Sequence, residues 1–341
     1  MPSVPGVLTA AEIRRTGEAI AAMQESSGAL PWFPGGQTDP WDHVESAMAL
    51  SATGLFARAE AAYDWSRRTQ RPDGSWPIRT VAGVVQDHGI DSNFCAYIAV
   101  GVWHHYLITR DRDFLERMWP TVWKAIELVL RFARDDGAFR WGGDHLTHAM
   151  FDEAQLTGNA SIHQALDCAV RIAQEMGQPE EAWARAHAAL GAAFQRADEV
   201  FEPPGEHSMD WYYPILGGAV RGRAGQELIA RRWDEFVVPG LGIRCVDHRP
   251  WVTGAETSEL ALALDALGDT DDAVALIASI QHLRDPDGAY WTGLVFADGK
   301  RWPVEKSCWT SAAVVLAADA VSRSTPGNAV FRDVRAEILA G

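Results

Sequence analysis

Charged amphipathic segments alternate along this chain with segments that are almost entirely apolar. The amphipathic segments are Ala10 to Gln24, Phe56 to Gln70, Asp113 to Arg134, Pro179 to Glu199, Arg223 to Phe236 and Asp271 to Gln281. Each is followed by a run rich in Ala, Val, Leu and Ile, such as Phe94 to Tyr106 or Thr310 to Ala318. An amphipathic helix keeps one side in water, whereas a helix that is apolar on nearly every side must be surrounded by protein.

This alternation occurs six times, which predicts a double ring of antiparallel helix pairs. The expected fold is therefore all-α, an (α/α)6 toroid. The 341 residues contain no Ser/Gly/Pro linker and no low-complexity tract. We expect residues 1–341 to form one domain, since closed rings of repeats run long as single domains.

A second repeat, a glycine turn followed by a tryptophan, ends four of the amphipathic segments. Its copies are Gln24 to Trp32, Gln70 to Trp76, Arg134 to Trp141 and Gln281 to Trp291. Glycine permits a positive φ beyond a helix end, and the tryptophan then packs the crossing loop. In a ring of hairpins these long loops lie on one face with the heads of the apolar helices, and function is expected on that face.

Polar and aromatic residues recur at the head of every apolar helix. The six heads are Trp41 to Ser46, Asp91 to Asn93, Gly158 to Ser161, Asp210 to Tyr213, Glu256 to Glu259 and Glu305 to Trp309. We expect them to form the rim of one pocket.

The charge balance excludes several partners. A net charge of -16, with 46 acidic and 30 basic residues, argues against nucleic acid or an anionic membrane surface, which both need clustered Lys and Arg. The apolar runs are shorter than the about 20 residues that span a bilayer. Four cysteines without paired spacing, and an N-terminus without a signal-peptide pattern, predict a reduced, cytoplasmic protein. No particular oligomeric state is indicated.

Two of the heads carry carboxylate pairs at i and i+3: Asp42 with Glu45, and Glu256 with Glu259. Such residues project from one helix face, with Cβ atoms about 5 to 6 Å apart. Glycosidic cleavage needs one carboxyl that protonates the leaving oxygen and one carboxylate that activates water or attacks carbon. We predict Glu256 as the general acid and Asp42 or Glu45 as the base of an inverting reaction.

Helix capping is the structural alternative for these carboxylates. Asp42 to Glu45 and Thr253 to Glu256 both fit a capping box, in which two side chains three residues apart satisfy backbone N–H groups. Asp91 and Asp210 are expected either to bind sugar hydroxyls or to cap their helices.

Aromatic residues are abundant, with 15 tryptophans, and aromatic rings stack on sugars. The predicted substrate-binding residues are Trp41, His43, His88, Asp91, Asp210, Trp211, Tyr212, Tyr213, Trp251, Glu259, Trp291 and Trp309. Packing between loops is the alternative for each aromatic residue. The predicted partner is an oligosaccharide or polysaccharide.

No metal or cofactor is predicted. The compact zinc candidate, Cys245 to His248, would need four consecutive residues to face one ion. Phosphate-loop and nucleophile-elbow motifs are absent. An Asp-x-Asp-Asp sequence, the proton-donor motif of class II terpene cyclases, occurs at Asp269 to Asp272, but it follows Gly268 and fits a helix end, an N-cap and an acidic first turn.

Several motifs resemble those of known helical-ring enzymes. Gln70 to Trp76 matches the Gln-x-x-Asp-Gly-x-Trp repeat of squalene cyclases and protein prenyltransferases, while Asp87 to Asn93, Trp103 to Tyr106 and Asp113 to Pro120 resemble glucoamylase-type six-hairpin glycosidases. Over its whole length the chain is similar to an actinobacterial group of methylmannose polysaccharide hydrolases, often labelled prenyltransferase. That resemblance implies an endo-acting α-(1→4)-mannosidase that acts on partly O-methylated chains without a metal.

Two other classes stay open. A terpene cyclase or prenyltransferase would need cations for a diphosphate, and the predicted long-loop face offers Arg79, Arg244, Arg249, Lys300, Arg301 and Lys306. A non-catalytic glycan- or lipid-binding ring would keep the aromatic wall but tolerate loss of Glu256.

Overall fold

The computed structural model describes residues 1–332 and is mostly helical. The amphipathic segments form α1 (Ala10–Met23), α3 (Phe56–Thr69), α6 (Arg112–Leu130), α8 (Glu181–Phe194), α11 (Gly222–Phe236) and α13 (Thr270–Ser279). The apolar runs form α2 (Pro40–Ala52), α4 (Ser92–Ala96), α5 (Ile98–Thr109), α7 (Leu156–Glu175), α10 (Met209–Leu216), α12 (Gly254–Leu267) and α14 (Cys308–Ser322). Three short elements complete the helices: α9 (Ala197–Val200) and the 3-10 helices η1 (Gln281–Leu283) and η2 (Pro326–Phe331).

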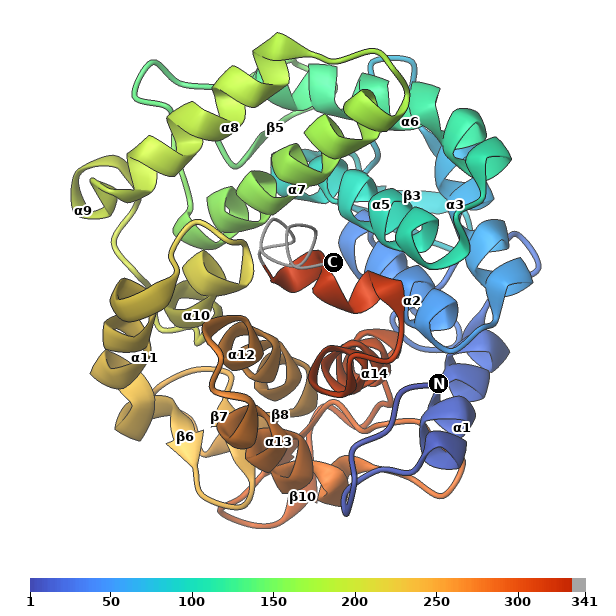
Figure 1. Cartoon of the computed structure of the whole chain (residues 1–341), viewed down its shortest axis with the longest axis vertical. Coiled ribbons are helices and arrows are strands. Elements are labelled where there is room, and N and C mark those ends of the chain that lie inside the picture. The colour runs from blue at the N-terminus through green and yellow to red at the C-terminus, as the bar shows by residue number, and fades with distance from the viewer. Residues whose placement is uncertain (333–341) are drawn as a thin grey trace.

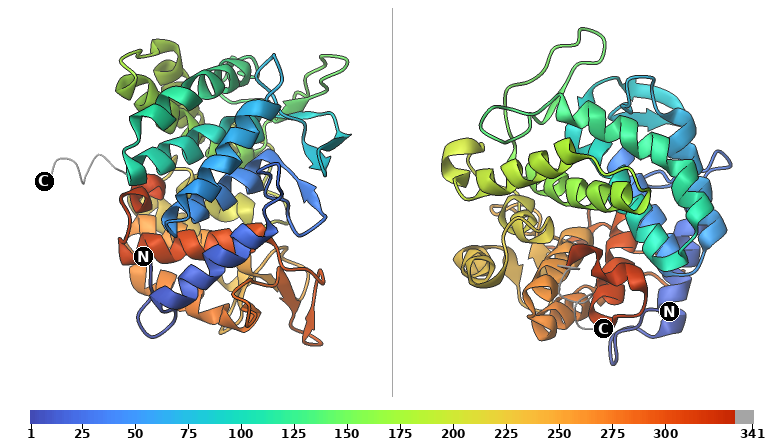
Figure 2. Two further views of the ribbon diagram at one scale, coloured as in Figure 1. Left: turned by 90° about the vertical axis from the view of Figure 1, so that its right-hand side faces the viewer. Right: turned by 45° about the horizontal axis from the view of Figure 1, so that its top comes forward.

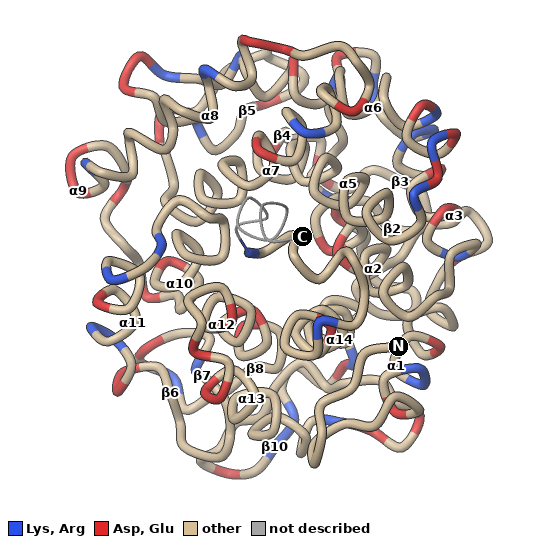
Figure 3. Tube along the Cα trace, in the orientation of Figure 1, with Lys and Arg blue, Asp and Glu red and all other residues tan. Residues whose placement is uncertain are grey.

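The apolar helices lie inside and the amphipathic helices outside. Each inner helix contacts the next along the chain, from α2 through α5, α7, α10 and α12 to α14, and α14 contacts α2 again. Every residue of α2 is buried, whereas α3 buries only one stripe. Charged residues accordingly gather on the outer helices and loops (Figure 3). None of the helices within residues 1–332 combines the length and the apolarity that a membrane crossing requires.

Short strands occupy the loops, so the expectation of a purely helical chain is incomplete. β1 (Gln37–Thr38), β2 (Arg79–Val81) and β3 (Val84–Asp87) form one antiparallel sheet, and β4 (Ile90–Asp91) pairs with β5 (Gly142–Gly143). A five-stranded antiparallel sheet contains β6 (Val237–Val238), β7 (Gly242–Arg244), β8 (Trp251–Thr253), β9 (Gly293–Val295) and β10 (Lys300–Arg301). Strands of two to four residues are too short to leave a periodic signal, yet they satisfy the loops' backbone groups. Figure 2 shows these hairpins on one side of the ring and the N-terminus on the other.

The glycine of each repeated turn packs directly on the backbone of a neighbouring outer helix. Gly28, Gly74, Gly137 and Gly288 all have φ between +93° and +98°. A Cβ atom on them would overlap backbone atoms of Ala61 in α3, Lys124 in α6, Ala189 in α8 and Arg15 in α1, respectively. The last contact brings the end of the ring back to its first helix.

Side chains of the same turns reinforce this packing. The Gln24 amide donates to the carbonyl of Arg58 at 2.9 Å, and the Gln70 amide donates to the carbonyl of Thr121 at 2.9 Å. Each amide also donates to the carbonyl of its own turn glycine. The repeat therefore spaces successive hairpins as well as reversing the chain.

The fourth residue of five inner helices holds the loop that enters that helix. In each case a backbone N–H of the incoming loop points to the side chain of that fourth residue. The Leu30 N–H donates to Nδ1 of His43, and the Phe139 N–H donates to Oδ1 of Asn159. The Ile243 and Tyr290 N–H groups donate to Oγ1 of Thr257 and Oγ of Ser311, respectively, and the Trp76 N–H faces the Cys95 thiol. The donors lie one or two residues beyond a loop glycine. These five head residues therefore hold loops, so fewer head positions remain to line the predicted pocket.

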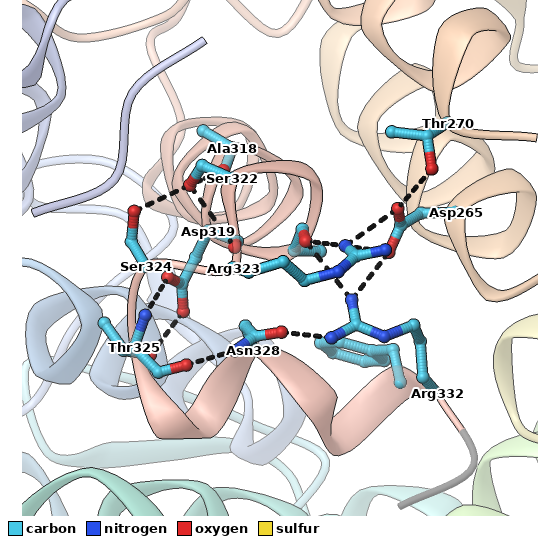
Figure 4. A network of polar contacts seen from close by, with 12 residues as sticks. Asp265, Thr270, Ala318, Asp319, Ser322, Arg323, Ser324, Thr325, Asn328 and Arg332 are labelled. Atoms are coloured by element: carbon cyan, nitrogen blue, oxygen red, sulfur yellow. Dashed lines mark hydrogen bonds and ion pairs between the residues drawn. The ribbon is translucent and has the colours of Figure 1, made fainter. Parts of the chain in front are cut away.

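The opposite side of the ring is closed by η2, which packs against α5, α12 and α14 (Figure 1). The buried carboxylate of Asp265 in α12 accepts hydrogen bonds from Arg323 and Arg332, each at 2.8 Å. Asp319 in α14 accepts from the N–H and the hydroxyl of Thr325 (Figure 4). These contacts fix η2 across the ring's central space.

We expect Gly74→Ala to destabilise the protein strongly. The left-handed backbone conformation would cost alanine about 1 to 2 kcal/mol of unfolding free energy. Its Cβ would also collide with the Lys124 carbonyl, so we expect a total loss above ~3 kcal/mol. Urea unfolding measures the loss.

Gly54→Ala is the matched control, because Gly54 also has positive φ (+75°) but a Cβ there meets nothing within 4 Å. It should cost only the backbone term of about 1 to 2 kcal/mol. Equal losses in the two variants would show that the turn packing contributes nothing.

Candidate active site

The first turn of α2 is capped by Asp39, not by Asp42. The Asp39 carboxylate accepts from the N–H groups of Trp41 at 3.0 Å and Asp42 at 2.8 Å. Pro40 is the first helical residue and has no N–H to satisfy. The capping-box alternative for Asp42 and Glu45 is therefore wrong, and the Asp-Pro dipeptide was the signal for the true cap.

The capping box predicted at α12 does not form either. Thr253 precedes the helix but makes no side-chain capping bond, and its hydroxyl is buried without a partner in the described part of the chain. Glu256 is thus free of a capping role, and so is Glu259 one turn later.

Helices α2 and α12 present carboxylates at the same two helical positions. Asp42 and Glu256 are the third residues of their helices, and Glu45 and Glu259 are the sixth. Three residues of helix rise about 4.5 Å, so the first pair lies nearer the loop face than the second. All four are buried, with 7%, 4%, 2% and 1% of Asp42, Glu256, Glu45 and Glu259 exposed. Helix α14 contacts both helices and lies between them in the ring.

The deeper pair is surrounded by aromatic hydrogen-bond donors. The hydroxyls of Tyr212 and Tyr213 donate to the two oxygens of Glu259 at 2.5 and 2.9 Å. Neither oxygen of Glu45 has a well-aligned partner within residues 1–332, although the indole N–H of Trp309 faces both carboxyls and lowers their pKa values slightly.

Burial dominates the ionisation of this deeper pair. It raises the pKa of Glu259 to about 8 despite the two tyrosine donors. Burial, together with the charge of Glu259, raises the pKa of Glu45 well above its usual value. The two carboxyls therefore retain protons more readily than exposed ones.

The upper pair has different neighbours. Burial and the adjacent carboxylate of Asp39 raise the pKa of Asp42. Beside Glu256 lies the thiol of Cys245, whose pKa is raised by burial and then by the Glu256 carboxylate. One oxygen of Glu256, Oε2, has no hydrogen-bond partner among the described residues, which leaves it available to a ligand.

Asp91 lies near Asp39, and two functions are open to it. It caps α4 by accepting from the N–H of Phe94 at 3.1 Å, as one of the alternatives predicted. Burial raises its pKa to about 7, and the nearby charge of Asp39 adds to the shift.

A continuous aromatic wall lines the ring axis. The ring of Trp41 lies 4.6 Å from Tyr97, 6.2 Å from Tyr213 and 6.3 Å from Trp309, measured between centroids, and Trp309 lies 5.6 Å from Trp32. With Glu45 and Glu259, part of this wall lines a cavity of about 10 Å³, which Phe331 of η2 also lines. Such a space holds about one water molecule.

Three predicted binding residues point away from this wall. His43, the fourth residue of α2, uses Nδ1 for Leu30 and Nε2 for the Ala62 carbonyl at 3.0 Å. Trp211 donates to the Leu228 carbonyl and stacks on a ring of α11. Asp210 accepts from Thr157 and from a loop N–H. Their side chains hold neighbouring elements, and none of the three lines the axial cavity described above.

Three further predicted residues lie elsewhere on the loop face. His88 is exposed at the end of β3. Trp291 lies beneath the Lys306 ammonium, 5.6 Å from its ring, and lines a cavity of about 610 Å³ beside α1. Trp251 lies on β8, outside the axial wall.

Three central residues escaped the sequence analysis. Asp39 could have been found from the proline that follows it. Tyr97 occupies the break between α4 and α5 inside an apolar run, and no local signal separates it from core residues. Trp32 was recognised only as a loop residue. No group of three or more His, Cys, Asp or Glu residues within residues 1–332 is arranged to hold a metal ion.

Solved structures with this helical arrangement include several glycosidases. A glycosidase variant in complex with glucose matches with a TM-score of 0.72 at 16% identity, covering 91% of this chain and 96% of that one. A bacterial glucoamylase complexed with acarbose gives 0.65 at 12% identity, over 93% of this chain and 57% of its own. A D-mannose isomerase gives 0.71 at 11%, over 92% and 97%. At such identities the likeness defines the fold class, a helical ring found in glycosidases and in other sugar enzymes.

Sequence comparison is more specific. No family model matches the chain. It is 58% identical over 334 residues to the MMP endo-(1,4)-3-O-methyl-alpha-D-mannosidase of Mycolicibacterium hassiacum, covering 98% of this chain and 92% of that protein. The chain belongs to the family of this mannosidase, and the resemblance expected from the sequence is confirmed.

The buried carboxyls predict that stability falls as the pH rises. In the folded protein Glu259 keeps its proton up to about pH 8, whereas in the unfolded chain it ionises near 4.5. Its stabilising contribution is therefore complete below pH 4.5 and is lost as the pH rises towards 8. Glu259→Gln cannot titrate, so its unfolding free energy should improve relative to the native protein across this window, by up to about 1.4 kcal/mol per pH unit.

Urea unfolding between pH 5 and 8 measures this difference, with the exposed Glu181→Gln as control. A constant difference between Glu259→Gln and the native protein over that range would contradict the assigned pKa.

Proposed function

We propose that this protein is an endo-acting glycoside hydrolase that cleaves internal α-(1→4) linkages in an O-methylated mannose polysaccharide. The observation that carries the proposal is the matched placement of Asp42 and Glu256 at the third position of two inner helices, in a chain 58% identical to a 3-O-methyl-mannosidase. The glycosidases that share the fold support the same class of reaction.

In the proposed reaction Glu256 is the general acid. Its proton passes to the glycosidic oxygen as the bond from that oxygen to the anomeric carbon breaks. Asp42 is the base, which removes a proton from a water molecule as that water bonds to the anomeric carbon. The products are two shorter chains, and the two carboxyls have exchanged protonation states. Solvent then restores them.

Asp42 is preferred over Glu45 as the base because of depth. Glu45 lies one helical turn further in, beside the small axial cavity. The position of Asp42 matches that of Glu256 and lies in the first turn of α2, where the helix dipole favours an anion. Glu45, Glu259, Tyr213 and Asp91 are then assigned to sugar hydroxyl groups.

The aromatic wall suits an O-methylated sugar. A methyl ether replaces a hydroxyl group by an apolar one, and the faces of Trp41, Tyr97 and Trp309 offer apolar surface. We assign these three residues to the sugar rings on either side of the scissile bond.

The same proposal covers the architecture and the location. Within residues 1–332, six outer helices and six inner runs, one of them divided into α4 and α5, fit an (α/α)6 toroid that forms one domain, supported by the contact between Gly288 and α1. The four cysteines are unpaired, which supports a cytoplasmic enzyme.

The experiment is product analysis of purified protein with methylated and unmethylated α-(1→4)-linked mannose oligosaccharides. The native enzyme should shorten the methylated substrate with or without EDTA. Glu256→Gln and Asp42→Asn should each lower kcat by ~10²- to 10⁴-fold, because each removes one proton-transfer group. Glu181→Gln should act like the native enzyme.

Intact substrate in every native reaction would overturn the proposal. A larger loss of kcat in Glu45→Gln than in Asp42→Asn would show that Glu45, rather than Asp42, is the base.

The stereochemistry follows from the same roles. Asp42 and Glu256 stand on helices that are separated by α14. We therefore propose that a water molecule fits between the two carboxyls and that the reaction inverts the configuration at the anomeric carbon. Proton NMR during the first turnovers should show the β-anomer at the new reducing end before mutarotation. An α-anomer formed first would mean retention and a covalent intermediate.

A further inference from the structure

Two tryptophans form an open corner outside the ring axis. The ring of Trp251, on β8, meets that of Trp302 at 82° with centroids 4.6 Å apart. The Trp251 indole N–H donates to the Trp302 carbonyl at 2.7 Å, and the Trp302 N–H donates to the Gly293 carbonyl of β9. Although it is held in this way, Trp302 remains 54% exposed. A large aromatic ring kept exposed and in a fixed place indicates a binding surface.

This corner is one wall of a groove of about 510 Å³, here called the Trp302 groove. Its lining combines apolar and polar side chains: Trp251, Trp302, Val246, Pro250, Val295, Glu206, His248 and Arg249. His248 is oriented by the Asp247 carboxylate, with Nδ1 and Oδ1 3.1 Å apart. The volume falls within the range of small-molecule sites, about 300 to 1,000 Å³, and an aromatic face beside scattered donors and acceptors suits a sugar.

Two segments of the chain connect residues that line the groove with the candidate active site. Strand β8 runs from Trp251 to Thr253 and leads straight into α12, whose third residue is Glu256. On the neighbouring segment, Cys245 lies beside Glu256 and the next residue, Val246, lines the groove. At about 3.3 Å per strand residue, Trp251 stands about 10 Å from the start of α12.

We propose that the Trp302 groove is a remote subsite that binds the polysaccharide chain several sugar units from the bond that is cleaved. The inference rests on the proposed function: an endo-acting enzyme must hold chain on both sides of that bond, and β8 leads from this groove into the helix that carries the general acid. Trp302 stacks on a sugar ring, while His248 and Arg249 meet its hydroxyl groups. Its contribution appears only with substrates long enough to reach it.

The test compares binding and cleavage for methylated α-(1→4) mannose oligosaccharides of increasing length. Trp302→Ala should raise Kd and KM about tenfold for long chains, the loss expected for one stacking ring, and should flatten the dependence of both on chain length. Trp302→Phe keeps an aromatic face and should restore most of the difference. Urea unfolding verifies that both variants fold.

Leu146→Ala is the matched control, because Leu146 is a similarly exposed apolar residue, 68% exposed, on another loop of the same face. It should bind and cleave every length like the native protein. Equal weakening in Leu146→Ala and Trp302→Ala, or native behaviour of Trp302→Ala at all lengths, would overturn the subsite.

Calorimetric binding separates this inference from the proposed function. If the native protein cleaves nothing but binds long chains more weakly after Trp302→Ala, the groove stands and the hydrolase assignment fails. If it cleaves internal bonds and Trp302→Ala changes neither Kd nor KM, the hydrolase stands and the groove is not a subsite.

Discussion

The contact between each turn glycine and the backbone of the next outer helix is the constraint on which the remaining structure depends. Gly28, Gly74, Gly137 and Gly288 allow this approach because they lack a side chain and tolerate positive φ. The contact sets the spacing of successive hairpins, and at Gly288 it joins the last hairpin to α1. Because the chain leaves each of these turns in a similar direction, the inner helices also start with a common rotation about their own axes, so that equivalent positions face the same way.

That common rotation divides the helix heads into positions with different roles. The fourth residue faces the incoming loop and carries a group that accepts its N–H, whether imidazole, amide or hydroxyl. The third and sixth residues of α2 and α12 turn towards the axis, which brings Asp42 level with Glu256 and Glu45 level with Glu259. The way the loops are anchored thus determines which side chains face the axis. Helix α10, whose head lacks such an anchor, contributes tyrosines instead.

This division also explains which features were predictable from the sequence. Hydrophobic periodicity located the longer helices because they span several turns, whereas strands of two to four residues gave no comparable signal. The paired carboxylates were visible as i, i+3 spacing, but their neighbours were not. His43 and Trp211 share the polar or aromatic character of the residues that line the axial cavity and differ from them in the direction they face, which depends on tertiary contacts. Asp39 could have been identified as the N-cap from the sequence, because Pro40 follows it and proline is favoured at the first helical position.

The cluster of Asp39, Asp42, Glu45 and Glu259 is costly, because burial and mutual repulsion both oppose ionisation. A fold selected only for stability would replace these side chains with apolar ones of similar size. Their presence beside the aromatic wall suits a polar, uncharged ligand, which can hydrogen-bond to carboxyls in either protonation state and exclude water from them. The described lining of the axial cavity, which includes Glu45 and Glu259, contains no Lys or Arg to offset the charge of a diphosphate. The electrostatics of the site therefore favour a neutral, hydroxyl-bearing substrate over an anionic one.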